Sequence, residues 1–271
     1  MGEVGQSSWQ LPPLVPDDPP PPYSKEDDSH ELSPDSPGRV CGASVFHQNL
    51  NGYGWKTLSG GSYYELGASR EELRFGVCVK CILSARSEYL HIHDGLEPEN
   101  DILANMSRNF EATPYGGKEQ EVFNLTLHAV EGPREAEEQV EMYQLRDSEW
   151  GHRNTLDLVI DIGGRSERFQ WRHSKGKEVK GLAGCSSGWK LVRLGSQEVG
   201  VGGKRKSREY GFTIDGKEVV AVIAQPLSFK RDFMFAFLGS GRSGALGNAW
   251  ETAALMSGIW RWWNSVNASP D

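Results

Sequence analysis

The last part of the chain carries its most concentrated run of apolar side chains. From Ala245 to Trp263 the sequence is ALGNAWETAALMSGIWRWW, in which only Glu251 and Arg261 are charged. A helix that is apolar on all sides must be surrounded by protein or by lipid. A membrane-spanning helix needs about 20 predominantly apolar residues, and polar residues interrupt this shorter run. The sequence therefore predicts a buried core helix. Its large apolar side chains include Trp250, Met256, Ile259 and Trp260.

The chain before this helix is typical of short β-strands, because apolar and polar residues alternate along it. In Thr155–Ile162 every second residue from Leu156 onward is apolar, which places these side chains on one face of a strand. Two-residue turns are indicated at Gly163-Gly164 and at Asp215-Gly216. The predicted strands are Val40–His47, Ser62–Leu66, Leu73–Ser84, Tyr89–His93, Glu121–Val130, Gln139–Leu145, Thr155–Ile162, Glu167–Ser174, Trp189–Leu194, Arg208–Ile214, Lys217–Gln225 and Asp232–Leu238.

About twelve short strands followed by one apolar helix predict a mainly β fold. The expected architecture is a closed antiparallel barrel around the hydrophobic C-terminal helix, and a chain of 271 residues can form one such domain. We expect this barrel domain to occupy residues 40–265, followed by a disordered end at residues 266–271.

Residues 1–39 differ in composition from the rest of the chain. They contain nine prolines and eight carboxylates, with very few aliphatic side chains, so we expect a disordered tail. Pro20, Pro21 and Tyr23 form a Pro-Pro-x-Tyr motif within a run of prolines. This motif favours polyproline II and is the form that WW-domain grooves accept. The tail is therefore expected either to recruit a WW-domain partner or to act as a solvated Pro-rich spacer.

The net charge of −8 hides two segments of opposite sign. Residues 97–161 carry fifteen Asp/Glu and five Lys/Arg, whereas residues 165–210 carry twelve Lys/Arg and four Asp/Glu. Only the second segment would attract an anionic partner. Its most basic stretch is a predicted loop, which suits phosphate head groups or an anionic lipid surface but also fits a solvated hairpin tip or a nuclear-localisation patch. These loop residues are Lys204, Arg205, Lys206 and Arg208.

Three short motifs match nucleotide-binding or metal-binding patterns, but the predicted structure around each of them argues against such a site. Gly239–Gly244 matches G-x-G-x-x-G, but no second parallel strand follows it, so we interpret it as a hinge into the helix rather than a nucleotide site. Cys78 and Cys81 lie on a predicted strand and point to opposite faces, which favours buried thiols over a metal site. His91 and His93 share a strand face but lack an evident third ligand. We therefore expect no metal, no cofactor and no catalytic residue.

The expected location follows from the cysteines and the first residues. Four cysteines in a chain of this length indicate reduced thiols rather than a disulfide framework. The chain begins with polar and Pro-rich sequence instead of a basic patch followed by an apolar run, so no secretory signal is expected. These features predict a cytoplasmic protein, with a peripheral-membrane or a nuclear location as further alternatives.

The chain from about Arg165 to Trp263 resembles a known superfamily. The matching stretches are, in order, FQWRHSKGKEVKG, GWKLVRLG, DGKEVVAVIAQ and DFMFAFLGSG, followed by the apolar helix. They are similar to the late strands and C-terminal helix of the tubby C-terminal-like superfamily, which includes tubby proteins, plant LURP-one-related proteins and phospholipid scramblases. The resemblance implies a twelve-stranded barrel threaded by that helix. The Pro-rich tail is also similar to the tails of scramblases.

Two departures from that superfamily limit the function it implies. Scramblases carry an acidic calcium-binding segment before the last helix, and no carboxylate lies between Asp232 and Glu251 here. Their palmitoylated cysteine cluster is absent as well. We therefore expect a non-enzymatic binding or adaptor protein that contacts phosphoinositide-rich or other anionic membrane surfaces and does not bind nucleic acid. The alternatives are a barrel that holds a small apolar ligand and an enzyme with dispersed site residues.

Overall fold

The computed structural model describes residues 45–58, 61–82, 87–109, 120–128, 138–145, 155–184, 187–195, 209–226 and 231–267. They all belong to one compact unit, Val40–Asp271. The predicted tail at residues 1–39 lies outside the described residues. The described residues contain no helix that is long and apolar enough to cross a membrane.

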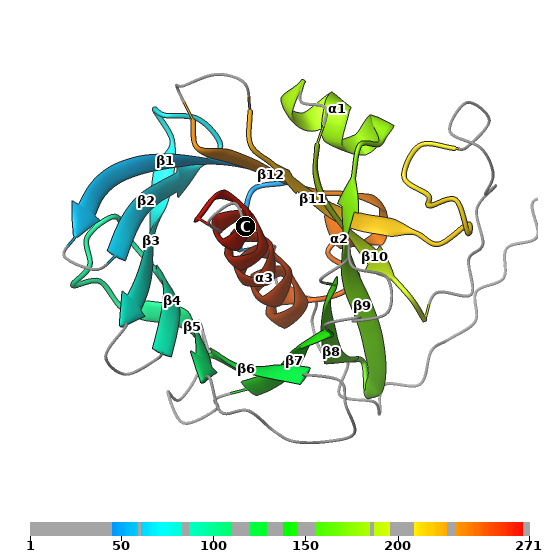
Figure 1. Ribbon diagram of the computed structural model, residues 1–271, viewed down its shortest axis with the longest axis horizontal. Coiled ribbons are helices and arrows are strands. Elements are labelled where there is room, and N and C mark those ends of the chain that lie inside the picture. The colour runs from blue at the N-terminus through cyan, green and yellow to red at the C-terminus, as the bar shows by residue number, and fades with distance from the viewer. Residues whose placement is uncertain are drawn as a thin grey trace, which may run out of the picture. The chain divides into compact units, whose positions relative to one another are not determined.

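The described chain consists mainly of antiparallel β-structure (Figure 1). Its strands are β1 (Asn49–Leu58), β2 (Gly61–Gly67), β3 (Leu73–Ile82), β4 (Ser87–His93), β5 (Ile102–Asn109), β6 (Gln120–Leu127), β7 (Glu138–Leu145), β8 (Thr155–Ile162), β9 (Arg165–Ser174), β10 (Gly188–Arg193), β11 (Val219–Ala224) and β12 (Phe233–Phe237). Its helices are α1 (Lys177–Ala183), α2 (Gly239–Arg242) and α3 (Asn248–Asn267). The predicted mainly β fold with a C-terminal helix is confirmed.

The strands follow one another around the sheet almost in chain order. Strand β1 pairs with β2 on one side and with β12 on the other, and both pairings are antiparallel. The order of hydrogen-bonded neighbours is therefore that of a closed barrel, β1-β12-β11-β10-β9-β8-β7-β6-β5-β4-β3-β2. Such an arrangement leaves no sheet edge unpaired.

Helix α3 runs through the space that the strands surround (Figure 1). Trp250 and Trp260 are fully buried, and their rings pack against Phe169 and Phe123, with centroids 5.6 and 5.5 Å apart. Met256 and Ile259 are also fully buried. At Gly258 a Cβ atom would lie 2.9 Å from the Trp171 ring, so the absence of a side chain lets this strand residue approach the helix.

The helix is shifted relative to the sequence-based prediction. It begins at Asn248 rather than Ala245, because Gly244 and Gly247 adopt left-handed conformations with φ of 74° and 83°. It continues to Asn267, four residues beyond the predicted helix end at Trp263, so residues 266 and 267 of the predicted disordered end are helical instead. The Gly-rich stretch before it also contains the single-turn helix α2.

Two strands were missed by the sequence pattern, and two predicted strands are wrong in the described residues. Strand β1 contains two asparagines and two glycines, which normally indicate a turn. One of these glycines is required by packing, since a Cβ at Gly52 would lie 2.2 Å from the Phe233 ring. Strand β5 has Ala and Met at inward positions, which are weak strand formers. The described part of Val40–His47, residues 45–47, is not a strand.

The predicted strand Arg208–Ile214 is reduced to one isolated bridge between Phe212 and Glu218. Gly211 has a φ of 85°, which interrupts extended backbone just before the bridge. The two predicted turns are present. Gly163 and Gly164 join β8 to β9 with φ of 61° and 78°, the signs that a type I′ hairpin requires.

Strand β11 is covered on both faces. All six of its residues are buried, in a continuous apolar run rather than an alternating one. Ala221 and Ile223 belong to the main core around α3, whereas Val219 and Val222 pack with Leu182 of α1. Helix α1 therefore covers the outer side of this part of the sheet, which fixes its position for the site described below.

Candidate functional site: a basic and apolar surface beside α1

Helix α1 is anchored on the barrel while its lysines face solvent. The Gly176 N–H before the helix donates to Ser174 Oγ at 3.0 Å. The helix ends at Gly184, a left-handed residue (φ 65°) whose N–H donates to the Lys180 carbonyl at 2.9 Å. Val179 is fully buried, whereas Lys177 and Lys180 are exposed.

The segment 209–218 lies against α1. Its Gly211 N–H donates to the buried Glu178 carboxylate of α1 at 3.4 Å. A Cβ at Gly181 would lie 3.7 Å from the Tyr210 hydroxyl, so the tyrosine lies beside the helix. Tyr210 is nevertheless 55% exposed. An aromatic side chain is thus held next to the lysines of α1.

A hairpin follows Tyr210 and presents an aliphatic side chain at its tip. Thr213 and Lys217 close it, with the Thr213 N–H donating to the Lys217 carbonyl and the Lys217 N–H donating to Thr213 Oγ1, both at 2.8 Å. Ile214 at the tip is 70% exposed. Arg172 of β9 contacts Asp215 at 3.3 Å and fixes the hairpin to the sheet. Partial burial alone would raise the pKa of Asp215, but its hydrogen bonds to Thr213 and Arg172 hold that pKa below the ordinary value.

These elements form a surface that combines positive charge with exposed apolar groups. In the part of the chain that the structure describes, Tyr210 and Ile214 are two of the four large apolar side chains with substantial exposure; Ile102 and Val266 are the other two. Three exposed lysines accompany them, while Glu209 is an exposed acid in the same segment. We define the α1 surface as Lys175, Lys177, Lys180, Tyr210 and Ile214.

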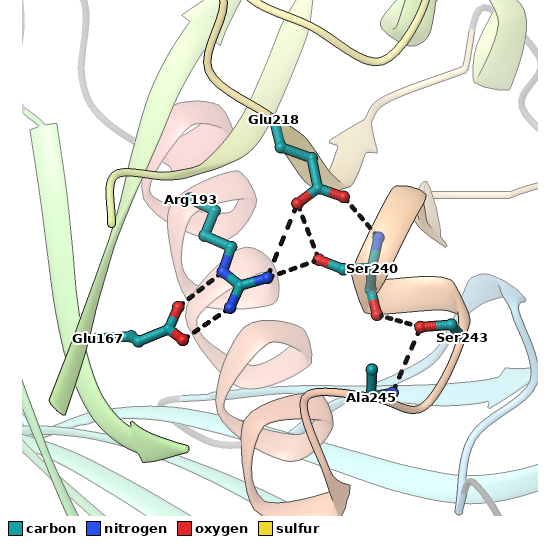
Figure 2. Close-up of polar contacts among 6 residues, drawn as sticks. All are labelled: Glu167, Arg193, Glu218, Ser240, Ser243 and Ala245. Carbon is teal, nitrogen blue, oxygen red and sulfur yellow. Dashed lines mark hydrogen bonds and ion pairs between the residues drawn. The ribbon is translucent and has the colours of Figure 1, made fainter. Parts of the chain in front are cut away.

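The four basic residues predicted to bind lipid, Lys204, Arg205, Lys206 and Arg208, lie outside the described residues. Among the described residues, a polar network joins Arg193 of β10 with Glu218, which precedes β11 (Figure 2). Arg193, at the end of β10, donates two hydrogen bonds of 2.6 Å to Glu167. Glu218, just before β11, accepts from the Ser240 N–H at 2.6 Å and from its hydroxyl at 2.9 Å. Arg193 also contacts Ser240 Oγ at 3.3 Å.

This network connects the end of β10 and the residue before β11 with the Gly-rich stretch before α3. The backbone of Arg193 donates to the Glu218 carbonyl at 3.0 Å, so these two residues lie side by side. At Ser240 the N–H is already satisfied by a carboxylate. A dinucleotide-binding turn would present such an N–H to a phosphate, so the contact favours the hinge interpretation of Gly239–Gly244.

The other predicted motifs do not converge on one site. Cys78 is a buried free thiol on β3, and burial raises its pKa above the ordinary value. The rings of His91 and His93 stack with centroids 6.3 Å apart, and His93 Nδ1 lies 3.0 Å from the Asn100 carbonyl oxygen. No group of three or more potential metal ligands occurs among the described residues. The WW-ligand motif, Pro20, Pro21 and Tyr23, lies outside the described residues.

The sequence reasoning missed the apolar half of the α1 surface. Tyr210 and Ile214 were assigned to a strand, where alternate side chains would be buried. The Asp215-Gly216 turn signal was sufficient to place Ile214 at a hairpin tip. Nothing in the local pattern indicated the seven-residue helix beside Tyr210.

Comparison of the chain with models of known protein families, with curated proteins and with solved structures finds no match. The class is therefore defined by the architecture alone, as an antiparallel β-barrel built around a C-terminal helix.

Proposed function

We propose that this protein is a non-enzymatic binding protein of the tubby C-terminal-like type, whose closed barrel docks on anionic membrane surfaces. In this proposal the contact is made by the α1 surface together with the basic segment from Lys204 to Arg208, which precedes Glu209 in the sequence. The observation that supports it best is the exposure of Tyr210 beside α1, whose lysines are exposed, and of Ile214 at the tip of the hairpin that follows. Basic residues attract anionic head groups, and exposed aromatic or aliphatic side chains insert at the interface.

The magnitudes indicate a reversible contact. Each basic residue near an anionic surface contributes about 1 kcal/mol, so the four loop residues together contribute roughly 4 kcal/mol. Transfer of a large apolar side chain out of water contributes about 1.5–3 kcal/mol when it is complete. Charge and apolar insertion are therefore of similar weight, and removal of either should weaken binding measurably.

Sedimentation with liposomes tests the proposal on the full chain. Liposomes of phosphatidylcholine with phosphatidylserine or phosphoinositide should bind the protein, whereas pure phosphatidylcholine should not. Binding should fall steeply as salt rises, because screening weakens the attraction. Replacing Lys204, Arg205, Lys206 and Arg208 by Ser should abolish it.

The apolar contribution needs its own variant. The double substitution Tyr210→Ser with Ile214→Ser should weaken liposome binding about tenfold or more, which corresponds to about 1.4 kcal/mol. Ile102→Ser is the matched control, because Ile102 is also exposed but lies on β5, away from α1. Equal binding by wild type and the double variant would remove the α1 surface from the proposal.

The tail gives the protein a second proposed contact. We assign Pro20, Pro21 and Tyr23 the role of recruiting a WW-domain partner to the membrane-bound barrel. A WW domain should bind the wild-type chain in a fluorescence titration, and Tyr23→Ala should abolish binding without changing liposome sedimentation. An unchanged titration would leave the tail as a Pro-rich spacer.

Two alternatives are weaker. A small apolar ligand inside the barrel has little support, because the large side chains of α3, such as Trp250 and Trp260, are fully buried against the strands. An enzyme with dispersed site residues is the other alternative; Tyr63, Cys78 and His91, whose pKa values are shifted chiefly by burial, are cross-strand neighbours on β2, β3 and β4.

A further inference from the structure

A second polar feature lies away from the α1 surface. A cavity of about 480 Å³ opens where β1, the turn between β2 and β3, and the segment before β12 meet. Small-molecule sites usually measure about 300–1,000 Å³, so the cavity has the size of a ligand site. The polar residues that line it include Asn51, Tyr53, Ser69, Arg70, Glu71 and Arg231.

Both arginines of this cavity are positioned by neutral groups. Arg231 Nη1 donates to Asn51 Oδ1 at 2.8 Å, and the Asn51 amide in turn donates to the Ala68 carbonyl at 2.5 Å. The Arg70 guanidinium carbon lies 5.8 Å from the centroid of the Tyr53 ring. Aromatic faces and amide oxygens orient a guanidinium without neutralising its charge.

Within the described residues, no carboxylate lies close enough to either guanidinium to form an ion pair. This distinguishes Arg70 and Arg231 from Arg168 and Arg193, which pair with Asp157 and Glu167. A guanidinium has five N–H donors, and Arg231 directs only one nitrogen to the partners named above and to Met234 Sδ. Donors thus remain for an oxyanion.

Glu71 is the acid in the lining, and it opposes an anion only weakly. Its hydrogen bond with Ser69, its own backbone and the positive charge of nearby Arg70 hold the pKa of its carboxyl below the ordinary value, so the group is ionised and partly offsets Arg70. The side chain is fully exposed, and the field of an exposed charge is strongly screened by water and salt. The lining keeps a formal charge of +1, from two arginines and one glutamate.

We propose that this cavity binds the phosphate group of a small phosphomonoester. Two guanidinium groups in one cavity match the bidentate geometry by which arginine holds phosphate oxygens. This site is separate from the α1 surface, so it does not depend on the membrane contact proposed above.

Titration of the full chain with inorganic phosphate tests this directly. Calorimetry at constant ionic strength should show saturable binding in the millimolar range, whereas acetate and chloride should bind at least tenfold more weakly. Arg70→Gln should weaken phosphate binding at least tenfold, and Arg70→Lys should weaken it less, since the charge is kept and the fork is lost. Arg74→Gln is the matched control, because Arg74 is also exposed and stacks on Phe75 outside the cavity, with its guanidinium carbon 4.8 Å from the ring.

Arg231→Gln, in a chain that keeps Asn51, should weaken phosphate binding as much as Arg70→Gln does. Circular dichroism and thermal unfolding without phosphate should match wild type for the Arg70 variants, since that side chain is exposed. Absence of saturable phosphate binding by the wild-type chain would overturn the proposal. So would equal binding by wild type and both Gln variants, or an equal loss in Arg74→Gln.

The phosphate group can come from a free metabolite or from a lipid head group. Liposomes with phosphatidic acid, which carries a phosphomonoester, distinguish them from liposomes with phosphatidylserine, which does not. If Arg70→Gln loses binding to phosphatidic acid liposomes but not to phosphatidylserine liposomes, the ligand is the lipid head group. If the two kinds of liposome bind equally and millimolar free phosphate still saturates the cavity, the ligand is the soluble compound. The Tyr210 and Ile214 variants should keep phosphate binding in solution, so failure of one proposal is separable from failure of the other.

Discussion

The side chain of Trp250 provides the sharpest test of a barrel that closes around its helix. Trp250 is fully buried, packs against Phe169 and Phe237, and leaves no room for a side chain at Gly241, where a Cβ would lie 2.6 Å from its ring. Its Nε1 has no hydrogen-bond partner, so Trp250→Ala deletes no hydrogen bond. The cost therefore consists of lost transfer free energy and an unfilled cavity.

The magnitude follows from the buried area. A buried aromatic side chain removes about 150–250 Å² from water, and at about 25 cal/mol per Å² this corresponds to roughly 4–6 kcal/mol. The methyl group that alanine retains offsets about 0.8 kcal/mol, which leaves a loss of about 3–5 kcal/mol, the range measured for Trp→Ala changes in cores. A typical domain is stable by only 5–15 kcal/mol, so the substitution removes a large share.

Urea unfolding of the full chain, followed by circular dichroism, measures this loss. Val266→Ala is the control on the same helix, because Val266 is 40% exposed, and it should change the free energy of unfolding by no more than about 0.5 kcal/mol. A chain truncated before Gly244 should be insoluble or molten, since the strands lose the surface they surround. A loss below about 1 kcal/mol for Trp250→Ala, or a soluble truncation that unfolds cooperatively, would refute the central-helix architecture.

Two further predictions concern packing and titration inside the barrel. Gly258→Ala should destabilise the protein by about 1–3 kcal/mol in the same urea assay, because the new Cβ would lie 2.9 Å from Trp171 and 3.0 Å from Phe235. This loss should exceed the gain from the higher helix propensity of alanine. An unchanged midpoint of unfolding would mean that these rings move aside freely. Burial, followed by the nearby His93, lowers the pKa of His91 in the folded state. The unfolded chain then binds more protons, so stability should fall as the pH decreases below about 6.5, and the fall should be smaller in His91→Gln; identical pH profiles would contradict this role of His91.

The helix and several strands were predictable because their signals are local. An apolar run such as that around Trp250 and Trp260 can be stable only when it is buried, whatever surrounds it. The β8–β9 hairpin was predictable for a similar reason, since Gly163-Gly164 can adopt the two positive φ angles that the turn needs, and the alternation in Thr155–Ile162 sets its buried face. The charge contrast between the acidic and basic segments also needs only composition.

Other features depended on partners distant in the sequence. Strand β1 has the local composition of a turn, and it is a strand because β12 and β2 pair with it and because the Phe233 ring occupies the space above Gly52. Helix α1 is too short to be stable alone, and it forms where Leu182 can pack on Val219 and Val222.

At the two candidate sites, too, some features follow from local sequence and others depend on the tertiary structure. The sequence identified the basic loop by its charge, but only the fold places Tyr210 beside α1. Arg70 and Arg231 are 161 positions apart and belong to no motif. They line one cavity because β1 pairs with both β2 and β12, which brings the segments after β2 and before β12 to the same end of the barrel. Local sequence determines how a segment can fold, whereas strand pairing across the closed barrel decides which side chains meet.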